Sequence, residues 1–296
     1  MTRDLPRLVS VIVPTFNCAH LIEVQLTALA EQDYPGEFEV IVSDNGSTDN
    51  LPALLTNHPL AALLNLRCVD SAGVVGASHA RNVGIGHARG DFLAFCDADD
   101  RAHPNWLTEM VKVASTSDAV GGPIETASLN APHIAKWLPV PPPDQQGSAA
   151  GMFRIVGSCN FGLWRSVFDA VGPWDESYVT GSEDADYCLR LQLAGFGLSH
   201  APKALMAYRV RTSHSEFRKQ QSAWAQSQVR IYAQYRDRGA QRPPLTMSPM
   251  QLIMLALHNP ALPRSLRQLS YGEWLFYAAG IAGRVRGSIR HRVYFV

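Results

Sequence analysis

Short apolar segments alternate with helix-like patterns throughout the first 120 residues of this 296-residue chain. Continuous apolar runs are typical of strands buried on both faces, and apolar residues spaced three or four apart are typical of the helices that cover such strands. The alternation predicts an α/β fold with a Rossmann-like, doubly wound, mostly parallel sheet. The expected strands are 9–14, 38–43, 66–69 and 92–96, and the expected helices are 20–31, 78–88 and 105–114.

Polar residues follow three of these expected strands directly. Residues 15–17 come after the first strand, Asp44 after the second and residues 97–100 after the fourth. Because ligands of such sheets bind outside the carboxyl ends of the strands, we expect these segments to meet in one crevice. Further along, the proline-rich residues 139–144 and the polar residues 145–151 predict a stiff loop followed by a mobile one.

The segment 97–100 places Asp97, Asp99 and Asp100 at the end of a strongly apolar run. Carboxylate oxygens suit the hard cations Mg²⁺ and Mn²⁺, and protein-bound Mg²⁺ usually keeps water and substrate phosphate oxygens in its shell. The segment therefore predicts Mg²⁺ or Mn²⁺ together with a phosphorylated substrate. A solvated acidic turn after a strand is the alternative.

A second acidic cluster, at 183–186, precedes a helix expected at 187–194. The adjacent carboxylates Glu183 and Asp184 favour a raised pKa on one of them, which suits a general base. Acidic residues also stabilise a helix N-terminus by complementing its dipole, and this alternative accounts for Asp186 on its own.

Composition excludes several classes of protein. A hydrophobic content of 46% supports a real core, and a formal net charge of +0 argues against a dedicated nucleic-acid binder. The five cysteines are scattered without CxxC spacing, which indicates reduced thiols in the cytoplasm and neither a disulfide framework nor a zinc site. Residues 1–8 lack the apolar stretch of a secretory signal, and no apolar run approaches the roughly 20 residues that span a bilayer.

The C-terminal residues 238–296 differ from the rest of the chain. They hold eight arginines against the single acid Glu273, a charge of 8 − 1 = +7, so the remaining residues carry −7. Aromatic residues interleaved with these arginines predict a helix that lies on anionic lipid headgroups at the inner face of the cell membrane. An oligomer contact or solvated arginines explain the mixture equally well.

Five short motifs follow one another along the chain. They are Val11-Ile12-Val13-Pro14-Thr15-Phe16-Asn17, Ser43-Asp44-Asn45-Gly46-Ser47-Thr48-Asp49, Ala80-Arg81-Asn82-Val83-Gly84, Asp97-Ala98-Asp99-Asp100 and Glu183-Asp184-Ala185-Asp186. In this order and spacing they resemble the motifs of family 2 glycosyltransferases, and the resemblance covers roughly residues 8–211. The resemblance implies a GT-A fold, a nucleotide-sugar donor, a divalent metal and inversion at the anomeric carbon.

The resemblance also assigns roles on the donor side. It implies that Asp99 is a metal ligand and that Asp97 is either a second ligand or a contact of the donor ribose or sugar. It implies that Asp44 reads the nucleobase, because a carboxylate accepts hydrogen bonds from a ring N–H such as that of uracil. Relatives more often have a second acid where Asn45 stands. The other implied donor contacts are Pro14, Thr15, Asn17 and Arg81, the last of which an ordinary surface arginine would also explain.

On the acceptor side, the resemblance implies that Asp184 is the general base opposite the leaving group and that Glu183 positions the acceptor or its neighbours. Trp174 and Asp175 are expected to stack on or bond to an acceptor sugar, although core packing also explains Trp174. Basic groups in the segment 208–211 occupy the place where some relatives close over the diphosphate.

We therefore expect a GT-A domain at 1–215, with a nucleotide-binding half at about 8–120 and an acceptor half at about 121–215, followed by a helical extension at 216–296. The predicted function is metal-dependent, inverting transfer of a sugar from a UDP-sugar to a hydroxyl of a saccharide or lipid-linked acceptor. The alternatives are a phosphatase of the haloacid dehalogenase type, with Asp97 as nucleophile, and a non-catalytic nucleotide-sugar-binding protein.

Overall fold

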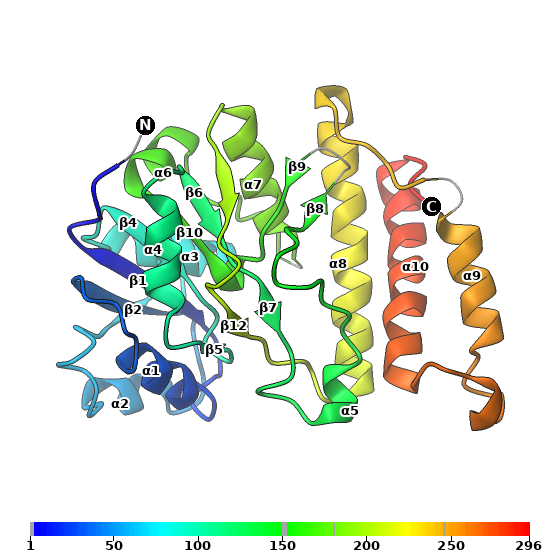
Figure 1. The fold of residues 1–296 in the computed structure, drawn as a ribbon, viewed down its shortest axis with the longest axis horizontal. Helices are drawn as coiled ribbons and strands as arrows, with labels where there is room; N and C mark the ends of the chain where they lie inside the picture. The colour runs from blue at the N-terminus through cyan, green and yellow to red at the C-terminus, as the bar shows by residue number, and fades with distance from the viewer. Residues whose placement is uncertain (1–2, 150–152, 180, 245–246) are drawn as a thin grey trace.

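The computed structural model describes residues 3–149, 153–179, 181–244 and 247–296. A seven-stranded sheet crosses its centre in the order β11-β6-β10-β4-β1-β2-β3 (Figure 1). The strands of this sheet are β1 (Val9–Thr15), β2 (Phe38–Asp44), β3 (Arg67–Asp70), β4 (Phe92–Phe95), β6 (Ala119–Gly121), β10 (Phe161–Trp164) and β11 (Leu198–His200).

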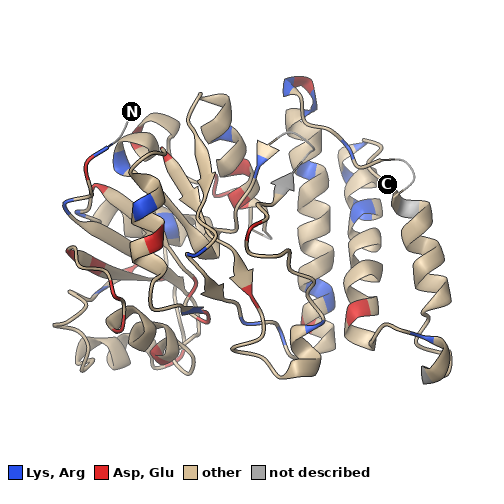
Figure 2. Cartoon of the chain, in the orientation of Figure 1, with Lys and Arg blue, Asp and Glu red and all other residues tan. Residues whose placement is uncertain are grey.

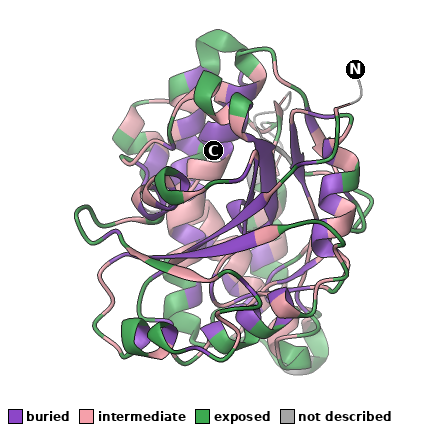
Figure 3. Ribbon diagram, turned by 90° about the vertical axis from the view of Figure 1, so that its left-hand side faces the viewer, coloured by how far each residue is buried: buried purple, intermediate pink, exposed green. Residues whose placement is uncertain are grey.

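The sheet is parallel where the sequence predicted it and mixed beyond β4. Strand β1 pairs in parallel with β2 and β4, and β2 with β3, whereas β10 runs antiparallel to both β4 and β6. Every residue of β4 is buried, as is all of β1 except Pro14, which explains why these strands are mostly apolar. Figure 3 shows buried residues gathered in the strands at the centre of the molecule. The predicted mostly parallel, doubly wound sheet is confirmed.

Helices connect these strands and bury their apolar faces against the sheet. In α1 the residues Ile22, Leu26 and Leu29 are fully buried, at the three- and four-residue spacing that marks one helix face. The three predicted helices all form, with ends within two residues of the expected positions. The helices of this half are α1 (Ile22–Ala30), α2 (Leu51–Thr56), α3 (Ala77–His87) and α4 (Trp106–Ala114).

The middle of the chain forms shorter elements. Strands β5, β12 and β7 make a small second sheet, and β8 pairs with β9 within and after the expected loop, whose residues 150–151 lie outside the described residues. Helix α7 begins four residues earlier than predicted, so all three acids of the second cluster lie in its first turn. The elements are β5 (Arg101–Ala102), β7 (Ile124–Glu125), α5 (Pro132–Ala135), β8 (Ser148–Ala149), β9 (Phe153–Arg154), η1 (Ser158–Asn160), α6 (Arg165–Val171), α7 (Glu183–Leu193) and β12 (Met206–Ala207).

The predicted C-terminal helical extension is confirmed, and its three α-helices stand side by side at one end of the molecule (Figure 1). Helices α8 and α10 approach closely because Gly283 of α10 has no side chain: a Cβ there would lie 2.3 Å from the carbonyl oxygen of Ser222. Lysine and arginine recur along α8 and α10, whereas α9 has no charged residue (Figure 2). The elements are α8 (His214–Tyr235), η2 (Arg236–Arg238), α9 (Met247–Leu257), η3 (Arg264–Leu266) and α10 (Tyr271–His291).

Within the described parts of the chain, no helix combines the length and the apolar character needed to cross a membrane.

Candidate functional site

A cavity of about 1330 Å³ opens where β1, β2 and β4 end. A pocket for one drug-sized ligand usually measures roughly 300–1,000 Å³, so this cavity has room for two substrates at once. Its walls come from the loops after these strands, from the start of α7 and from the C-terminal extension. Two of the three polar segments that the sequence predicted to meet, 15–17 and 97–99, therefore line one crevice, and the third is represented by Asn45, the neighbour of Asp44.

Asn17 fixes the loop after β1 against the turn after β2. Its backbone N–H donates to Ser47 Oγ (2.9 Å), and its side-chain Oδ1 accepts from the N–H of Thr48 (2.7 Å). Asn17 has φ 51°, a left-handed conformation that asparagine adopts more readily than most residues. Pro14, Thr15 and Asn17, three of the predicted donor contacts, all line the cavity.

Asp44 ends β2 at the edge of this cavity without being part of its lining. It is 8% exposed, and its Oδ1 accepts the N–H of Ser47 (2.9 Å) to close the turn. The next residue, Asn45, lines the cavity instead, and its side-chain amide bonds to three backbone groups of the segment 71–76. Sequence reasoning treated Asn45 only as a departure from the family pattern and missed this structural role.

Asp97 and Asp99 both line the cavity, with side chains that are 32% and 20% exposed. Asp97 Oδ1 accepts from Arg81 Nη2 (3.2 Å), and Asp99 Oδ2 lies 3.5 Å from Arg211 Nη1. Burial raises the pKa of Asp97, and Arg81 opposes this rise. Two carboxylates thus face the cavity, each beside a guanidinium group.

Carboxylate groups, the ligand type that hard divalent cations prefer, gather at this end of the cavity. Among the described residues, ligand atoms of Asp97, Asp100 and Cys159 lie within 4.8 Å of one another. Burial raises the pKa of the Cys159 thiol well above its usual range, and a protonated sulfur is a poor ligand for Mg²⁺ or Mn²⁺. Asp100 is fully buried and accepts the N–H of Arg209 (2.9 Å). Of the three aspartates in the segment 97–100, Asp97 and Asp99 line the cavity and Asp100 does not.

Arg81 joins the two acidic clusters. It is 2% exposed; its Nη1 donates to Glu183 Oε1 (3.0 Å), its Nη2 to Asp97, and its guanidinium carbon lies 5.3 Å from the ring centre of Trp174. Burial alone would lower the pKa of Arg81, but Glu183 and Asp97 outweigh burial and raise it, so the group is charged. Helix α3 can hold Arg81 this close to the sheet because Gly84 has no side chain. A Cβ at Gly84 would lie 2.7 Å from a β1 side chain. The surface-arginine alternative is wrong.

Asp184 lies in the first turn of α7 and lines the cavity. Its Oδ1 accepts the N–H of Ala185 (2.7 Å), and its Oδ2 lies 3.4 Å from the N–H nitrogen of Ser158. Burial, followed by the neighbouring Glu183, raises the pKa of Asp184 from 3.8 to about 7. A carboxyl group that titrates near neutral pH is well matched to taking a proton from a hydroxyl group.

The structure corrects the expectation that Trp174 stacks on an acceptor sugar. Trp174 is 1% exposed, and its ring stacks on Tyr187 with centres 4.4 Å apart, so its large apolar surface belongs to the core. Asp175 does not line the cavity either, because its carboxylate accepts the N–H (2.9 Å) and hydroxyl (2.6 Å) of Ser177.

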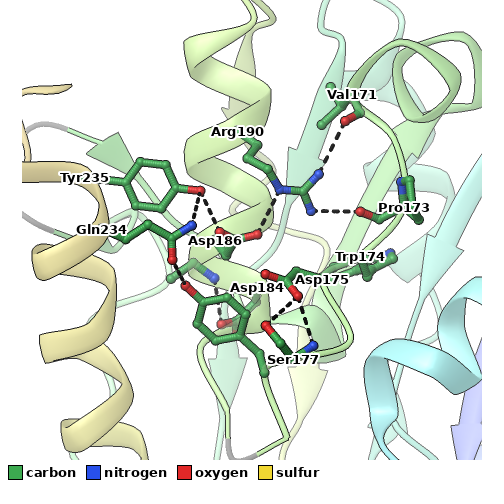
Figure 4. A network of polar contacts seen from close by, with 12 residues as sticks. Val171, Pro173, Trp174, Asp175, Ser177, Asp184, Asp186, Arg190, Gln234 and Tyr235 are labelled. Carbon is green, nitrogen blue, oxygen red and sulfur yellow. Dashed lines mark hydrogen bonds and ion pairs between the residues drawn. The ribbon is translucent and has the colours of Figure 1, made fainter. Parts of the chain in front are cut away.

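A buried polar network ties α7 to the C-terminal extension (Figure 4). Asp186 accepts from the hydroxyl of Tyr235 (2.6 Å) and from Arg190 Nε (2.8 Å). Alongside this pair, the hydroxyl of Tyr178 donates to Gln234 Oε1 (2.9 Å). Asp186 therefore does more than complement a helix dipole: it holds α7 against α8.

Sequence reasoning missed one wall of the cavity entirely. Four side chains of α8 line it at intervals of four, four and three residues, which places them on one face of the helix. The available signal was a tryptophan flanked by glutamines at helical spacing, where an ordinary core-facing stripe would be aliphatic. These residues are Gln220, Trp224, Gln228 and Ile231, with Arg242 and Phe295 beyond the helix.

Two family models match this chain. The model of glycosyl transferase family 2 matches residues 10–172, and that of glycosyl transferase family group 2 matches residues 92–283. Each match spans more than half of the chain, and together they include all the lining residues named above except Phe295.

Curated relatives agree with these models. The chain is 30% identical over 235 residues to glycosyltransferase AglE of Haloferax volcanii, an alignment that covers 78% of this chain and 76% of AglE. It is 26% identical over 214 residues to the amylovoran biosynthesis glycosyltransferase AmsB of Erwinia amylovora, covering 69% of this chain and 70% of AmsB.

Solved structures show the same fold. Mannosyltransferase PcManGT of Pyrobaculum calidifontis, in complex with GDP-Man and Mn²⁺, superposes with a TM-score of 0.59 at 21% identity, covering 98% of this chain and 77% of PcManGT. TarS of S. aureus superposes with a TM-score of 0.55 at 21% identity, and the match covers 95% of this chain but only 55% of TarS. A truncated TarS bound to UDP gives a TM-score of 0.55 at 23% identity, covering 97% of this chain and 93% of that one. The expected GT-A fold is confirmed.

Proposed function

This chain belongs to glycosyl transferase family 2, and on that premise we propose that it transfers a sugar from a UDP-sugar to a hydroxyl group of a saccharide or lipid-linked acceptor. The transfer depends on Mg²⁺ or Mn²⁺ and inverts the configuration at the anomeric carbon. Family membership carries the transferase activity itself; the nucleotide, the metal and the stereochemistry are our proposal.

One observation carries the proposal furthest: the aspartates after β4 and the acid pair that begins α7 line the same cavity, and Arg81 bridges them. Sugar transfer needs a group that stabilises the departing diphosphate and a base that activates the acceptor, within one site. The cavity brings the two requirements together from residues about 85 positions apart in the chain.

On the donor side, Asp97 and Asp99 would hold the divalent cation, which, when bound, offsets the negative charge that grows on the leaving diphosphate. Arg211, paired with Asp99, adds a cation at the same end of the cavity. Pro14, Thr15 and Asn17 support the nucleotide; their position in the lining favours this role. Asp44 remains our choice for the nucleobase contact, and Arg81 acts on the donor by holding Asp97.

On the acceptor side, Asp184 takes the proton of the attacking hydroxyl as the new glycosidic bond forms on the face opposite the leaving group. Its pKa of about 7 keeps a large share of the group ionised at neutral pH while leaving it basic enough to help. Glu183 is held by Arg81 and fixes the first turn of α7, which aims Asp184 into the cavity. Asp175 lies outside the lining, so we give it at most a supporting contact with the acceptor.

The choice of a UDP-sugar rests on similarity to related structures. A TarS structure similar to this chain contains UDP, and PcManGT contains GDP-Man with Mn²⁺. Both support a nucleotide diphosphate donor, and the PcManGT complex supports a divalent metal. We favour UDP because a carboxylate such as that of Asp44, at the end of β2, accepts hydrogen bonds from a ring N–H like that of uracil.

We also propose that the enzyme works in the cytoplasm, at an anionic membrane face. The five cysteines are free, in keeping with a reducing compartment. Apolar side chains of α9, Leu252 and Ile253 among them, are exposed beside the arginine-rich α10. Sedimentation with vesicles of phosphatidylglycerol, but not phosphatidylcholine, should carry the protein down, and the double change Leu252→Glu with Ile253→Glu should abolish this. Leu63→Glu, at an exposed site far away in the sequence, is the matched control.

The test of the proposed function is a screen of nucleotide sugars with Mn²⁺ or Mg²⁺ that measures released nucleoside diphosphate. We expect release with one donor, and we expect Asp184→Asn to keep donor binding while transfer to acceptors is lost. Inorganic phosphate without nucleoside diphosphate would instead indicate the phosphatase, which the family matches do not favour. Donor binding with no turnover in the unaltered protein would indicate a non-catalytic sugar-nucleotide binder.

A further inference from the structure

We propose that the cavity-facing side of α8 is the acceptor subsite, and that it binds a neutral or anionic oligosaccharide with one sugar ring against Trp224. This inference rests on the proposed function, and it names the substrate class that the acceptor end of the cavity is built to take. None of the five sequence motifs includes these residues.

The chemistry of this helix face matches a carbohydrate. Gln220, Trp224 and Gln228 recur every four residues along α8 and line the cavity. An indole offers a flat apolar surface for the C–H face of a pyranose ring, and glutamine amides both donate to and accept from sugar hydroxyls. A helix face that served only as core would carry aliphatic residues at these positions.

The position of Trp224 places this face beside the proposed base. A Cβ at Gly181 would lie 2.5 Å from Trp224 Cδ1, so the indole packs directly on the turn that leads into α7. Gly181 has φ 107°, which disfavours other residues and keeps this approach open. Asp184 follows three residues later and lines the same cavity, so an acceptor ring on Trp224 would share the cavity with the carboxylate that takes the proton of its hydroxyl group.

The indole is also held in place before any ligand binds. Trp224 is half-buried, and its inner side packs against a second apolar cluster around Trp137, Phe217 and Leu275. The network from Asp186 to Tyr235 fixes the other end of α8 against α7 (Figure 4). A fixed aromatic surface loses little conformational entropy on binding, so it favours affinity.

The charges around this end of the cavity select among saccharides. The carboxylates in the described lining are Asp97, Asp99, Glu183 and Asp184, all at the donor end or in the base turn. The α8 side instead has the exposed Arg242, which has no carboxylate partner among the described residues and lies over the ring of Tyr294 (5.3 Å). A neutral or anionic saccharide therefore suits this wall better than a cationic one.

The experiment measures binding of the full-length protein, with Mn²⁺ and UDP present, to an array of immobilised oligosaccharides. The array holds neutral hexose oligomers, uronic-acid oligomers and cationic glucosamine oligomers. We expect binding to neutral or anionic members and at least about tenfold weaker binding by Trp224→Ala. Trp224→Tyr, which keeps an aromatic ring, should restore most of the affinity. Lys219→Ala, at an exposed residue of α8 outside the lining, should bind as the unaltered protein does.

Gln228→Ala is a second variant that should fold normally, because the side chain of Gln228 is exposed and its loss leaves no cavity in the core. It should weaken the same array signals about threefold, roughly the loss of one hydrogen bond. Three outcomes would each overturn the subsite. The first is equal binding by the unaltered protein, Trp224→Ala and Gln228→Ala; the second is preference for the cationic oligomers; the third is no binding to any saccharide. Nucleoside diphosphate release in the donor screen reports on the proposed function separately: release combined with Trp224-independent binding removes only the subsite.

Discussion

The floor of the cavity is made by loops that follow β1, β2 and β4, whereas its far wall is one face of α8, a helix from the C-terminal extension. The floor contains carboxyl and guanidinium groups held in pairs, such as Asp97 with Arg81 and Asp99 with Arg211. The wall contains amides and aromatic rings, with Trp224 at its centre. One surface handles charge, and the other offers shape and hydroxyl-bonding groups.

The two surfaces also differ in how strongly their residues depend on one another. In the floor, removal of one partner leaves a desolvated charge without compensation, so single changes should have large effects. In the wall, side chains pack or form neutral hydrogen bonds, and single changes should cost about 1 kcal/mol each. A graded series of substitutions can test this contrast.

Among changes to the floor, Asp99→Asn should have the largest effect. Loss of this carboxylate weakens binding of the cation that would stabilise the leaving diphosphate, and we expect the transfer rate to fall on the order of 10³-fold. Initial rates at saturating donor, measured across a Mn²⁺ titration, are the test, and excess Mn²⁺ should recover part of the loss. Chelation of metal from the unaltered protein should reproduce the defect.

Asp237→Asn is the matched control, since the side chain of Asp237 is 92% exposed and lies outside the cavity lining. It should leave the rate and the Mn²⁺ dependence unchanged. An Asp99→Asn protein with full activity and unaltered Mn²⁺ dependence would remove Asp99 from metal binding and would break the contrast between floor and wall.

Arg81→Lys should have the second largest effect, because Arg81 is the side chain that links the floor to the base-bearing helix. A lysine ammonium lacks the planar fork that reaches Glu183 and Asp97 together. We expect transfer to fall about 10²-fold and the free energy of unfolding to fall by about 3 kcal/mol, which chemical denaturation measures. Arg218→Lys, at an exposed position of α8, should change neither. An unchanged free energy of unfolding in Arg81→Lys would show that the Arg81 bridge between Glu183 and Asp97 contributes little to stability.

The same contrast explains what could be predicted from the sequence. Floor residues such as Asp97 and Asp99 lie in short contiguous motifs at strand ends, and the topology of a parallel sheet brings strand ends together. The sequence therefore predicts the sheet, the helices of the first half and the crevice. The wall was not, because the role of Trp224 depends on where α8 packs, and the sequence specifies that through distant contacts such as Tyr235 with Asp186.

The two aromatic residues Trp174 and Trp224 also show that position in the sequence does not predict which side chains face the cavity. Trp174 lies close to the acid pair in sequence and was expected to meet the acceptor, yet its ring is buried on Tyr187. Trp224 lies about 40 residues further along the chain and lines the cavity. Nearness in sequence to a catalytic motif says little about which side of a helix or loop faces the site.

A smaller effect is expected from Tyr235→Phe, which removes one hydroxyl from the network that joins wall and base helix. The Tyr235 hydroxyl donates to Asp186, which is 1% exposed, so its loss leaves a buried carboxylate oxygen short of a partner. We expect a loss of about 1–2 kcal/mol in the free energy of unfolding. The KM for donor should not change, because the floor is untouched. Tyr277→Phe, whose hydroxyl forms no hydrogen bond among the described residues, should be neutral; a donor KM that rises in Tyr235→Phe would show that the two surfaces are coupled.

The smallest effect on stability concerns Asp184, the carboxyl group between floor and wall, and its sign separates function from stability. Because the pKa of Asp184 is raised from 3.8 to about 7 in the folded protein, the unfolded chain loses this proton at lower pH than the folded protein does. The resulting destabilisation is absent below pH 3.8, grows as pH rises and is complete above pH 7. Asp184→Asn removes it, so the variant should be inactive in transfer yet more stable at pH 8. We expect on the order of 1 kcal/mol, reduced by solvent in the open cavity, or about 2 °C in Tm, with almost no difference at pH 4. The measurement is thermal unfolding of both proteins from pH 4 to pH 8. If the stability difference between them shrinks as pH rises, the surroundings of Asp184 stabilise its carboxylate. Asp184 would then lack the raised pKa that we infer for the base.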